Sequence, residues 1–269
     1  MKRRHLIRYA QASLLASLGM GVASGLQVYR AQTSSPKQSQ KAASGGSLSI
    51  QWLGHTCFLF TGEGKRILVN PFRTVGCTAR YRLPKVASDL VMISSQLLDE
   101  GFIEAVPGNP RLLYEAGLYQ FKGMPIQGIG IDHDRNNGRR FGNNVAWRWT
   151  QSGIRIVHLG GAAGPIVLEQ KILMGRPDVL LIPVGGGPKA YNAQEAKQTI
   201  QALNPRLVIP THYRTQAADP AACEIAPLDE FLSLMEGTSV RRVQSDTVTL
   251  KASDLPEQGP QTMVMSYRF

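Results

Sequence analysis

The chain has 269 residues, of which 43% are hydrophobic and 18% are charged, so one large domain or two small ones with a sizeable core are possible. Its formal net charge is +11, but residues 1–46 hold seven of the thirty basic residues and no acidic one. The remainder carries 23 basic against 19 acidic residues, a net of +4, which excludes the strongly basic surface of a nucleic-acid-binding protein.

The N-terminus resembles a bacterial export signal of the twin-arginine type. Arg3 and Arg4 lie in a basic start, and a weakly apolar stretch follows, so we predict a signal over residues 1–26. The polar residues 27–46 are predicted to form a flexible linker before a domain at 47–269. Export would place the domain in the periplasm or the thylakoid lumen, with membrane contact only through the signal or through an uncleaved anchor. A simple basic tail is the alternative.

Hydrophobic patterning predicts short strands in the first half and a strand–helix alternation in the second. The predicted strands are 48–53, 57–60, 66–70, 90–93, 111–114, 118–121, 126–131, 145–150, 154–158, 178–184 and 207–210, with two more near the C-terminus. Helices are predicted at 165–175, 192–203 and 228–236, the second with Asn192 as its N-cap. This order fits an α/β (α+β) sandwich of two mixed sheets flanked by helices, an αββα arrangement.

The three cysteines, Cys57, Cys77 and Cys223, are far apart and form no CxxC pair. In an exported protein two of them could form a disulfide, whereas three buried free thiols are the default elsewhere. The sequence does not choose between these states.

Polar residues lie where predicted strands end, which is where α/β proteins place their chemistry. They include four of the five histidines, His55, His133, His158 and His212, and the stretch DLVMISSQLLDE at 89–100. An acidic pair, Asp99 and Glu100, closes this stretch. A metal site is one interpretation, and an acidic cap on a helix that starts at Glu100 is the other.

Eight sequence blocks occur in the order found in metallo-β-lactamase-fold hydrolases. They are WLGHTCF (52–58), LVNPF (68–72), DLVMIS (89–94), GNPRLL (108–113), DHD (132–134), VHLGG (157–161), LIPVGGG (181–187) and VIPTHY (208–213). The chain resembles this superfamily, in particular the branch of ascorbate-6-phosphate lactonase-like and N-acylphosphatidylethanolamine phospholipase D-like proteins. The resemblance implies a metallo-β-lactamase fold and a two-zinc centre at the strand ends.

Most zinc ligands of that family are replaced in this chain. The HxHxDH loop has Ser95, Leu97, Asp99 and Glu100 at its ligand positions, and Gly161 stands where the bridging aspartate is expected. The aspartate that supports the loop corresponds to Asn70. His133 and His212 match the two remaining histidines, while His55 and Gly185 follow the family pattern.

The resemblance therefore implies a site without a two-zinc centre. We expect either no metal or a single Zn, Mn or Fe ion at Asp99, Glu100 and His212, with His133 as a weaker ligand candidate. Asp99 and His133 are the catalytic candidates, and a cleft lined by His55, Asn70, Ser95, Leu97, Gly161 and Gly185 is expected to bind a small molecule or a protein. The leading interpretation is a ligand-binding pseudoenzyme. The alternatives are a one-metal hydrolase of phosphodiesters, lactones or esters, and an assembly factor at the membrane surface.

Overall fold

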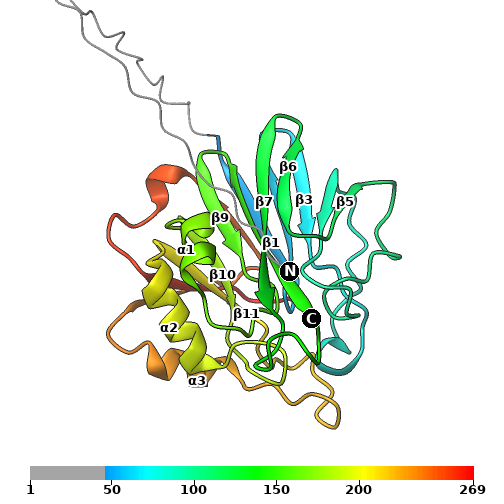
Figure 1. The fold of residues 1–269 in the computed structure, drawn as a ribbon, viewed down its shortest axis with the longest axis vertical. Coiled ribbons are helices and arrows are strands. Elements are labelled where there is room, and N and C mark those ends of the chain that lie inside the picture. Colours follow the sequence, from blue (N-terminus) through cyan, green and yellow to red (C-terminus); the bar gives the residue numbers. More distant parts are fainter. Residues whose placement is uncertain (1–45) are drawn as a thin grey trace, which may run out of the picture. The chain divides into compact units, whose positions relative to one another are not determined.

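The computed structural model describes residues 46–269 (Figure 1). The predicted export signal (1–26) and all of the predicted linker except Gly46 lie outside the described residues, so both remain predictions. Between residues 46 and 269, no helix combines the length and the apolar character that crossing a membrane requires.

Two mixed sheets form the fold. The six-stranded sheet has the order β13-β1-β2-β3-β4-β5, with β1 (Leu48–Gly54), β2 (Cys57–Gly62), β3 (Lys65–Val69), β4 (Leu90–Met92), β5 (Arg111–Leu113) and β13 (Thr247–Leu250). The eight-stranded sheet has the order β12-β14-β11-β10-β9-β8-β7-β6, with β6 (Gly117–Phe121), β7 (Met124–Asp132), β8 (Asn143–Gln151), β9 (Ile154–His158), β10 (Val179–Pro183), β11 (Leu207–Thr211), β12 (Ser239–Arg242) and β14 (Gln261–Val264). The α-helices are α1 (Leu168–Met174), α2 (Ala193–Leu203) and α3 (Leu228–Leu234), and the short 3-10 helices are η1 (Gly76–Thr78) and η2 (Ala252–Asp254).

The hydrophobic pattern explains where each strand lies. β1 alternates between buried and half-buried residues, as expected of a strand with one face on the core. β10 and β11 are buried along their whole length and pair in parallel, Val179 opposite Leu207, because both faces of a parallel strand are covered. Parallel pairing also directs the carboxyl ends of β9, β10 and β11 to one edge of the sheet, where polar residues follow.

The main core lies between the two sheets. Phe60 of β2 packs edge-on against Trp149 of β8, with ring centroids 4.9 Å apart, and Trp147 donates a hydrogen bond from Nε1 to the carbonyl of Ile93. Each aromatic ring thus joins one sheet to the other, and the indole N–H is satisfied in the core. The predicted metallo-β-lactamase-type sandwich of two mixed sheets is confirmed.

The three α-helices among residues 46–269 come late in the chain. Within the described residues, α1, α2 and α3 all follow β9 in the chain, and Figure 1 shows them grouped beside β9, β10 and β11. The other face of the six-stranded sheet carries a smaller cluster that includes Leu68, Tyr81 and Val91 and is covered by irregular segments.

No helix starts at Glu100, contrary to the capping interpretation of the acidic pair. Residues 98–106 form turns instead, in which Glu100 N donates to the Leu97 carbonyl. Gly101 passes so close to Ser95 that a Cβ there would lie 2.3 Å from its carbonyl oxygen. This close approach fixes a tight turn, and Pro107 and Pro110 follow it before β5.

Helix α2 begins with a capping box whose strength is testable. The Asn192 side chain accepts a hydrogen bond from Glu195 N at 2.9 Å, and the Glu195 carboxylate accepts from Asn192 N at 2.9 Å. Asn192→Ala removes the first of these bonds and is expected to cost about 1 kcal/mol of unfolding free energy in urea titrations. Gln194→Ala, a change at an exposed position in the first turn of α2, is the control. Equal losses of unfolding free energy from both variants would contradict a capping role.

Candidate functional site

Three residues at the candidate site have left-handed backbone conformations that non-glycine residues rarely adopt. His55 follows β1 with φ of 52°, Asn70 follows β3 with φ of 51°, and His212 follows β11 with φ of 50°. Such conformations cost on the order of 1–3 kcal/mol each and persist where the surroundings hold them. The sheets therefore impose strained turns at the strand ends that carry these polar side chains.

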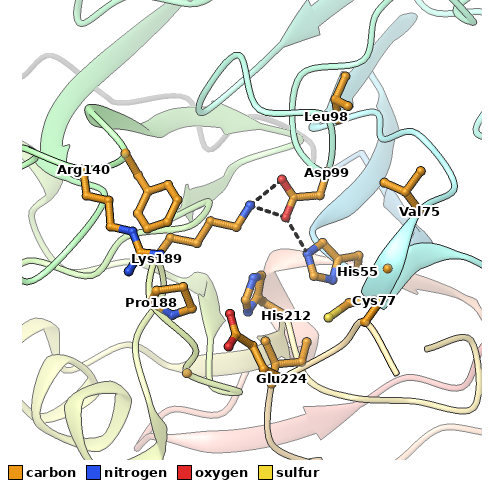
Figure 2. A pocket seen from close by; sticks show the side chains of 15 residues that line it. His55, Val75, Cys77, Leu98, Asp99, Arg140, Pro188, Lys189, His212 and Glu224 are labelled. Carbon is orange, nitrogen blue, oxygen red and sulfur yellow. Dashed lines mark hydrogen bonds and ion pairs between the residues drawn. The ribbon is translucent and has the colours of Figure 1, made fainter. Parts of the chain in front are cut away.

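A cleft of about 330 Å³ opens at these strand ends (Figure 2). Its titratable lining residues are His55, Asp99, Arg140, Lys189, His212 and Glu224. They come from five different loops, and apolar side chains such as Val75 and Leu98 fill the wall between them. Polar groups thus converge in a partly apolar pocket of the size that holds a small molecule.

His55, Asp99 and His212 form a compact group of ligand-type side chains. Each offers one ligand atom, and these atoms all lie within 4.8 Å of one another. The two imidazole rings are 4.4 Å apart between centroids. Neither nitrogen of buried His55 nor Nδ1 of buried His212 has a hydrogen-bond partner among residues 46–269. Burial, aided by His55, lowers the pKa of His212 to about 3, so its ring is neutral and its nitrogen lone pair is free.

Lys189 extends across the cleft to Asp99. Its Nζ lies 2.5 Å from both carboxylate oxygens of Asp99, and His55 Nε2 lies 3.6 Å from one of them. Burial raises the pKa of Asp99, but the neighbouring His55 and the positive charge of Lys189 outweigh it and hold that pKa well below its usual value. Asp99 is therefore a carboxylate that an internal cation already neutralises.

Glu100 points away from this cluster into the interior. Its carboxylate lies 3.4 Å from His133 Nε2 and accepts a hydrogen bond from Ser95 Oγ at 3.1 Å, while His133 Nδ1 is 2.6 Å from the Gly161 carbonyl. Burial raises the pKa of Glu100, but hydrogen bonding to His133 and its charge reverse the direction, so the Glu100 pKa is lowered. The same contact raises the pKa of His133 against the effect of burial. The two form a buried ion pair.

Glu100 and His133 pack closely against Gly161. A Cβ at Gly161 would lie 2.3 Å from His133 Cε1 and 2.6 Å from Glu100 Oε1. No side chain fits there without displacing both partners. An aspartate at this position, as the family pattern has it, is therefore incompatible with the arrangement of Glu100 and His133.

The structure groups the expected ligands differently from the sequence-based prediction. Asp99 and His212 lie together, but the third member of their group is His55, and Glu100 belongs with His133 instead. Glu100 is separated from the cleft because the turn at 97–101 directs consecutive side chains to opposite sides.

Of the expected cleft residues, His55 alone is among the residues that line this cavity, and Asn70, Ser95 and Gly185 contact segments next to it. Asn70 accepts a hydrogen bond from Ser94 N at 2.8 Å and so holds the loop, and Ser95 binds Glu100. Gly185 lies against the His212 backbone, where a Cβ would come within 2.2 Å of the His212 carbonyl oxygen. Leu97 and Gly161 lie outside the cavity lining.

Sequence reasoning missed Lys189, Arg140 and the pairing of two cysteines. Cys77 and Cys223 form a disulfide between two loops that border the cleft, and Cys57 is a buried free thiol. Lys189 follows the Gly185–Gly187 run that the family pattern includes, so its position next to a functional loop was the available signal. A single lysine in such a loop is otherwise indistinguishable from a surface charge.

His158 is a buried neutral histidine that makes the stability depend on pH. Its Nε2 donates to the Thr56 carbonyl at 3.0 Å, and its Nδ1 accepts from Gly160 N at 3.1 Å. Burial lowers the pKa of His158 to about 4, below the value of about 6.5 in the unfolded chain. The unfolded chain therefore takes up the proton first as the pH falls, and about 3 kcal/mol of stability is expected to be lost between pH 6.5 and pH 4 through this group.

Urea titrations across that pH range measure this loss. His158→Gln keeps a donor and an acceptor but does not titrate, so its stability is expected to fall less steeply than that of the wild type. His212, whose pKa is also lowered, contributes in the same window in both proteins, whereas His133, whose pKa is raised, acts above pH 6.5. Identical slopes for the two proteins would contradict the assignment to His158.

The chain is similar in sequence to a known protein family. A family profile described as "Beta-lactamase superfamily domain" matches residues 49–212. A protein named "UPF0173 metal-dependent hydrolase" from Thermoplasma acidophilum is 25% identical over 196 residues, which are 63% of this chain and 84% of that relative. A protein of the same name from Thermococcus onnurineus is 27% identical over 207 residues, covering 64% and 89%.

Solved structures give the same result. A putative zinc-dependent hydrolase of the metallo-β-lactamase superfamily from Thermotoga maritima superposes with a TM-score of 0.65 at 30% identity, over 81% of this chain and 98% of that one. The profile match spans most of the region between β1 and His212 and includes the entire candidate cluster. The chain therefore belongs to the β-lactamase superfamily domain family and has the metallo-β-lactamase fold.

Proposed function

We propose that this protein binds a small molecule in the cleft beside Asp99 and does not carry out two-zinc hydrolysis. Its relatives are named metal-dependent hydrolases, so a metal centre is what the family implies. The residues of this chain provide for only part of such a centre. The observation that carries the proposal is the ion pair of Glu100 and His133, which fills the space beside Gly161.

Two metal ions do not fit the side chains present. A two-metal site needs several imidazoles and a bridging carboxylate around ions about 3.5–4 Å apart. Ser95 and Leu97 offer no nitrogen ligand, and a carboxylate at residue 161 would collide with the buried pair. His133 Nδ1 also contacts the Gly161 carbonyl, and its Nε2 lies 3.4 Å from the Glu100 carboxylate.

The cleft itself suits a small polar ligand. His55 and His212 present buried nitrogens without a hydrogen-bond partner among residues 46–269, and the Lys189 ammonium makes two of its three hydrogen bonds to Asp99. Arg140 lies over the Phe141 ring at 4.8 Å at the same opening. These groups favour a ligand with oxygen acceptors on an apolar body, which would pack against Leu98 and its neighbours.

A change that fills the cleft tests this proposal. Thermal shifts of the untagged protein would be measured with a panel of small lactones, carboxylates and phosphate esters, and Leu98→Trp is expected to abolish any shift seen with the wild type. Leu118→Trp is the matched control because Leu118 is an exposed leucine outside the cleft lining. Loss of the shift in both variants, or in neither, would contradict binding in the cleft.

A one-metal hydrolase is the second candidate function. The unpartnered nitrogens of His55 and His212, together with the Asp99 carboxylate, are a donor set that a single zinc, manganese or iron ion accepts. Such an ion would supply Lewis-acid polarisation of a carbonyl or phosphoryl group. The protein residues would orient the substrate, with the apolar cleft wall excluding water.

Metal analysis combined with turnover separates the two functions. The hydrolase requires a stoichiometric metal, measured by plasma emission after gel filtration, and turnover of phosphodiester, lactone or ester substrates. Both must disappear in Asp99→Ala. Metal and turnover in the wild type, both lost in Asp99→Ala, would overturn the binding-protein proposal. Saturable ligand binding without metal or turnover would overturn the hydrolase.

We also propose that the protein is exported. The disulfide between Cys77 and Cys223 supports this, because disulfides persist in oxidising compartments. Cell fractionation of the full chain and of its Arg3→Lys/Arg4→Lys variant tests the role of the paired arginines. Equal distribution of both proteins between compartments would contradict a twin-arginine signal.

A further inference from the structure

Lys189 lies on a loop whose conformation is fixed by backbone hydrogen bonds. The loop joins β10 to α2 and is held at both ends, because Gly185 N donates to the His212 carbonyl at 2.9 Å and Gly186 N donates to the Tyr191 carbonyl at 2.8 Å. From this fixed loop the side chain reaches over the cleft, and Figure 2 shows its amine meeting both oxygens of Asp99. The contact joins the loop after β10 to the loop after β4.

The Lys189 amine lies beside a group of side chains that could hold a metal ion. Asp99 and the two histidines supply one carboxylate and two imidazoles, with ligand atoms within 4.8 Å of one another. Both buried imidazoles retain nitrogens without partners, although buried polar atoms are nearly always satisfied. The ammonium of Lys189 donates to Asp99 and makes no hydrogen bond to either histidine among residues 46–269.

An ammonium and a divalent ion cannot share this carboxylate. A bound zinc ion lies about 2.0–2.2 Å from a carboxylate oxygen, and Lys189 Nζ lies 2.5 Å from both oxygens of Asp99. The two cations would be a few ångströms apart and would repel each other strongly in a partly buried cleft. The lysine stem is flexible, and the side chain is 20% exposed, so movement into solvent would release Asp99.

We propose that Lys189 is an internal cation that closes a latent divalent-metal site at His55, Asp99 and His212, so that a metal binds there only when Lys189 leaves Asp99. This inference builds on the proposed loss of the two-metal centre. It adds that Asp99 and His212, which match two of the family's metal ligands, form a donor set with His55 that a single lysine side chain closes.

Zinc titration calorimetry of untagged, chelator-treated full chains tests the inference. Lys189→Met removes the charge and keeps much of the volume, and it is expected to bind one Zn²⁺ about tenfold or more tightly than the wild type. Lys189→Arg keeps a cation that can bind a carboxylate with two hydrogen bonds, so it is expected to behave like the wild type. Lys122→Met is the matched control, because it removes the lysine of another aspartate pair, Lys122–Asp89, at 2.8 Å and away from the cleft lining.

The gained zinc site must depend on the proposed ligands. Lys189→Met/His212→Ala is expected to lose the affinity that Lys189→Met gains, and circular dichroism of each variant confirms that it is folded. Equal zinc affinity of the wild type and Lys189→Met would overturn the inference. If neither protein binds zinc, the proposed ligand-binding function stands and only the latent site is rejected; if both bind it tightly and turn over substrate, both proposals fail.

Discussion

Replacing His133 with alanine is expected to lower the free energy of unfolding by about 3–5 kcal/mol, because the change leaves the Glu100 carboxylate buried without its partner. Glu100 and His133 are both fully buried, and Ser95 alone would remain to bind the carboxylate. Urea unfolding at pH 7, followed by tryptophan fluorescence, measures the loss. Trp147 and Trp149 lie in the core between the sheets and report its exposure.

A double-mutant cycle separates the ion pair from the loss of volume. Glu100→Ala and His133→Ala each remove one charge, and the double variant removes both, so its loss is expected to be smaller than the sum of the single losses by more than about 1 kcal/mol. Additive losses within about 0.5 kcal/mol would contradict an interaction between the two side chains.

Removal of the Cys77–Cys223 disulfide is the second large expected effect. The bond closes a loop with a sequence separation of 146 residues. Chain-entropy arguments assign about 5 kcal/mol to a loop of this length, and measured losses are typically about 2–5 kcal/mol. We expect about 3–5 kcal/mol for Cys77→Ser/Cys223→Ser, measured by urea unfolding without reductant.

Reductant supplies the control for this prediction. The wild type should lose a similar amount of stability on reduction, whereas the double serine variant should be unaffected. Two backbone hydrogen bonds, Asp219 N to the Gly76 carbonyl and Arg80 N to the Ala217 carbonyl, also join these loops. A loss below about 1 kcal/mol would show that such contacts, and not the disulfide, hold the cleft wall together.

The strands were predictable because burial leaves a pattern in the sequence. The alternation in β1 and the continuous apolar run of β10 correspond to a one-sided and a two-sided strand, and both lie where the sequence predicts them. The turn after Leu97, where the acidic pair could also indicate the start of a helix, was not predictable in the same way, because it depends on the approach of Gly101 to Ser95. Local propensity carries no information on that contact.

The site was predictable in position but not in its pairings. The order of the family blocks places the 89–100 loop at the strand ends, and Asp99 does lie in the cleft. The directions of Asp99 and Glu100 differ because they depend on the turn between them, and Glu100 reaches His133 across the interior. Lys189 and the cysteine pair are contacts between residues 90 and 146 positions apart, which a single sequence does not reveal.

Glu100 and His133 fill the space beside Gly161, where the family pattern has a metal-bridging aspartate. Zinc-edge anomalous scattering from crystals grown with excess zinc chloride tests this arrangement most directly. We expect no anomalous peak between Glu100, His133 and Gly161, and at most one peak near Asp99 and His212. Two peaks about 3.5–4 Å apart, one of them bound by His133, would contradict it.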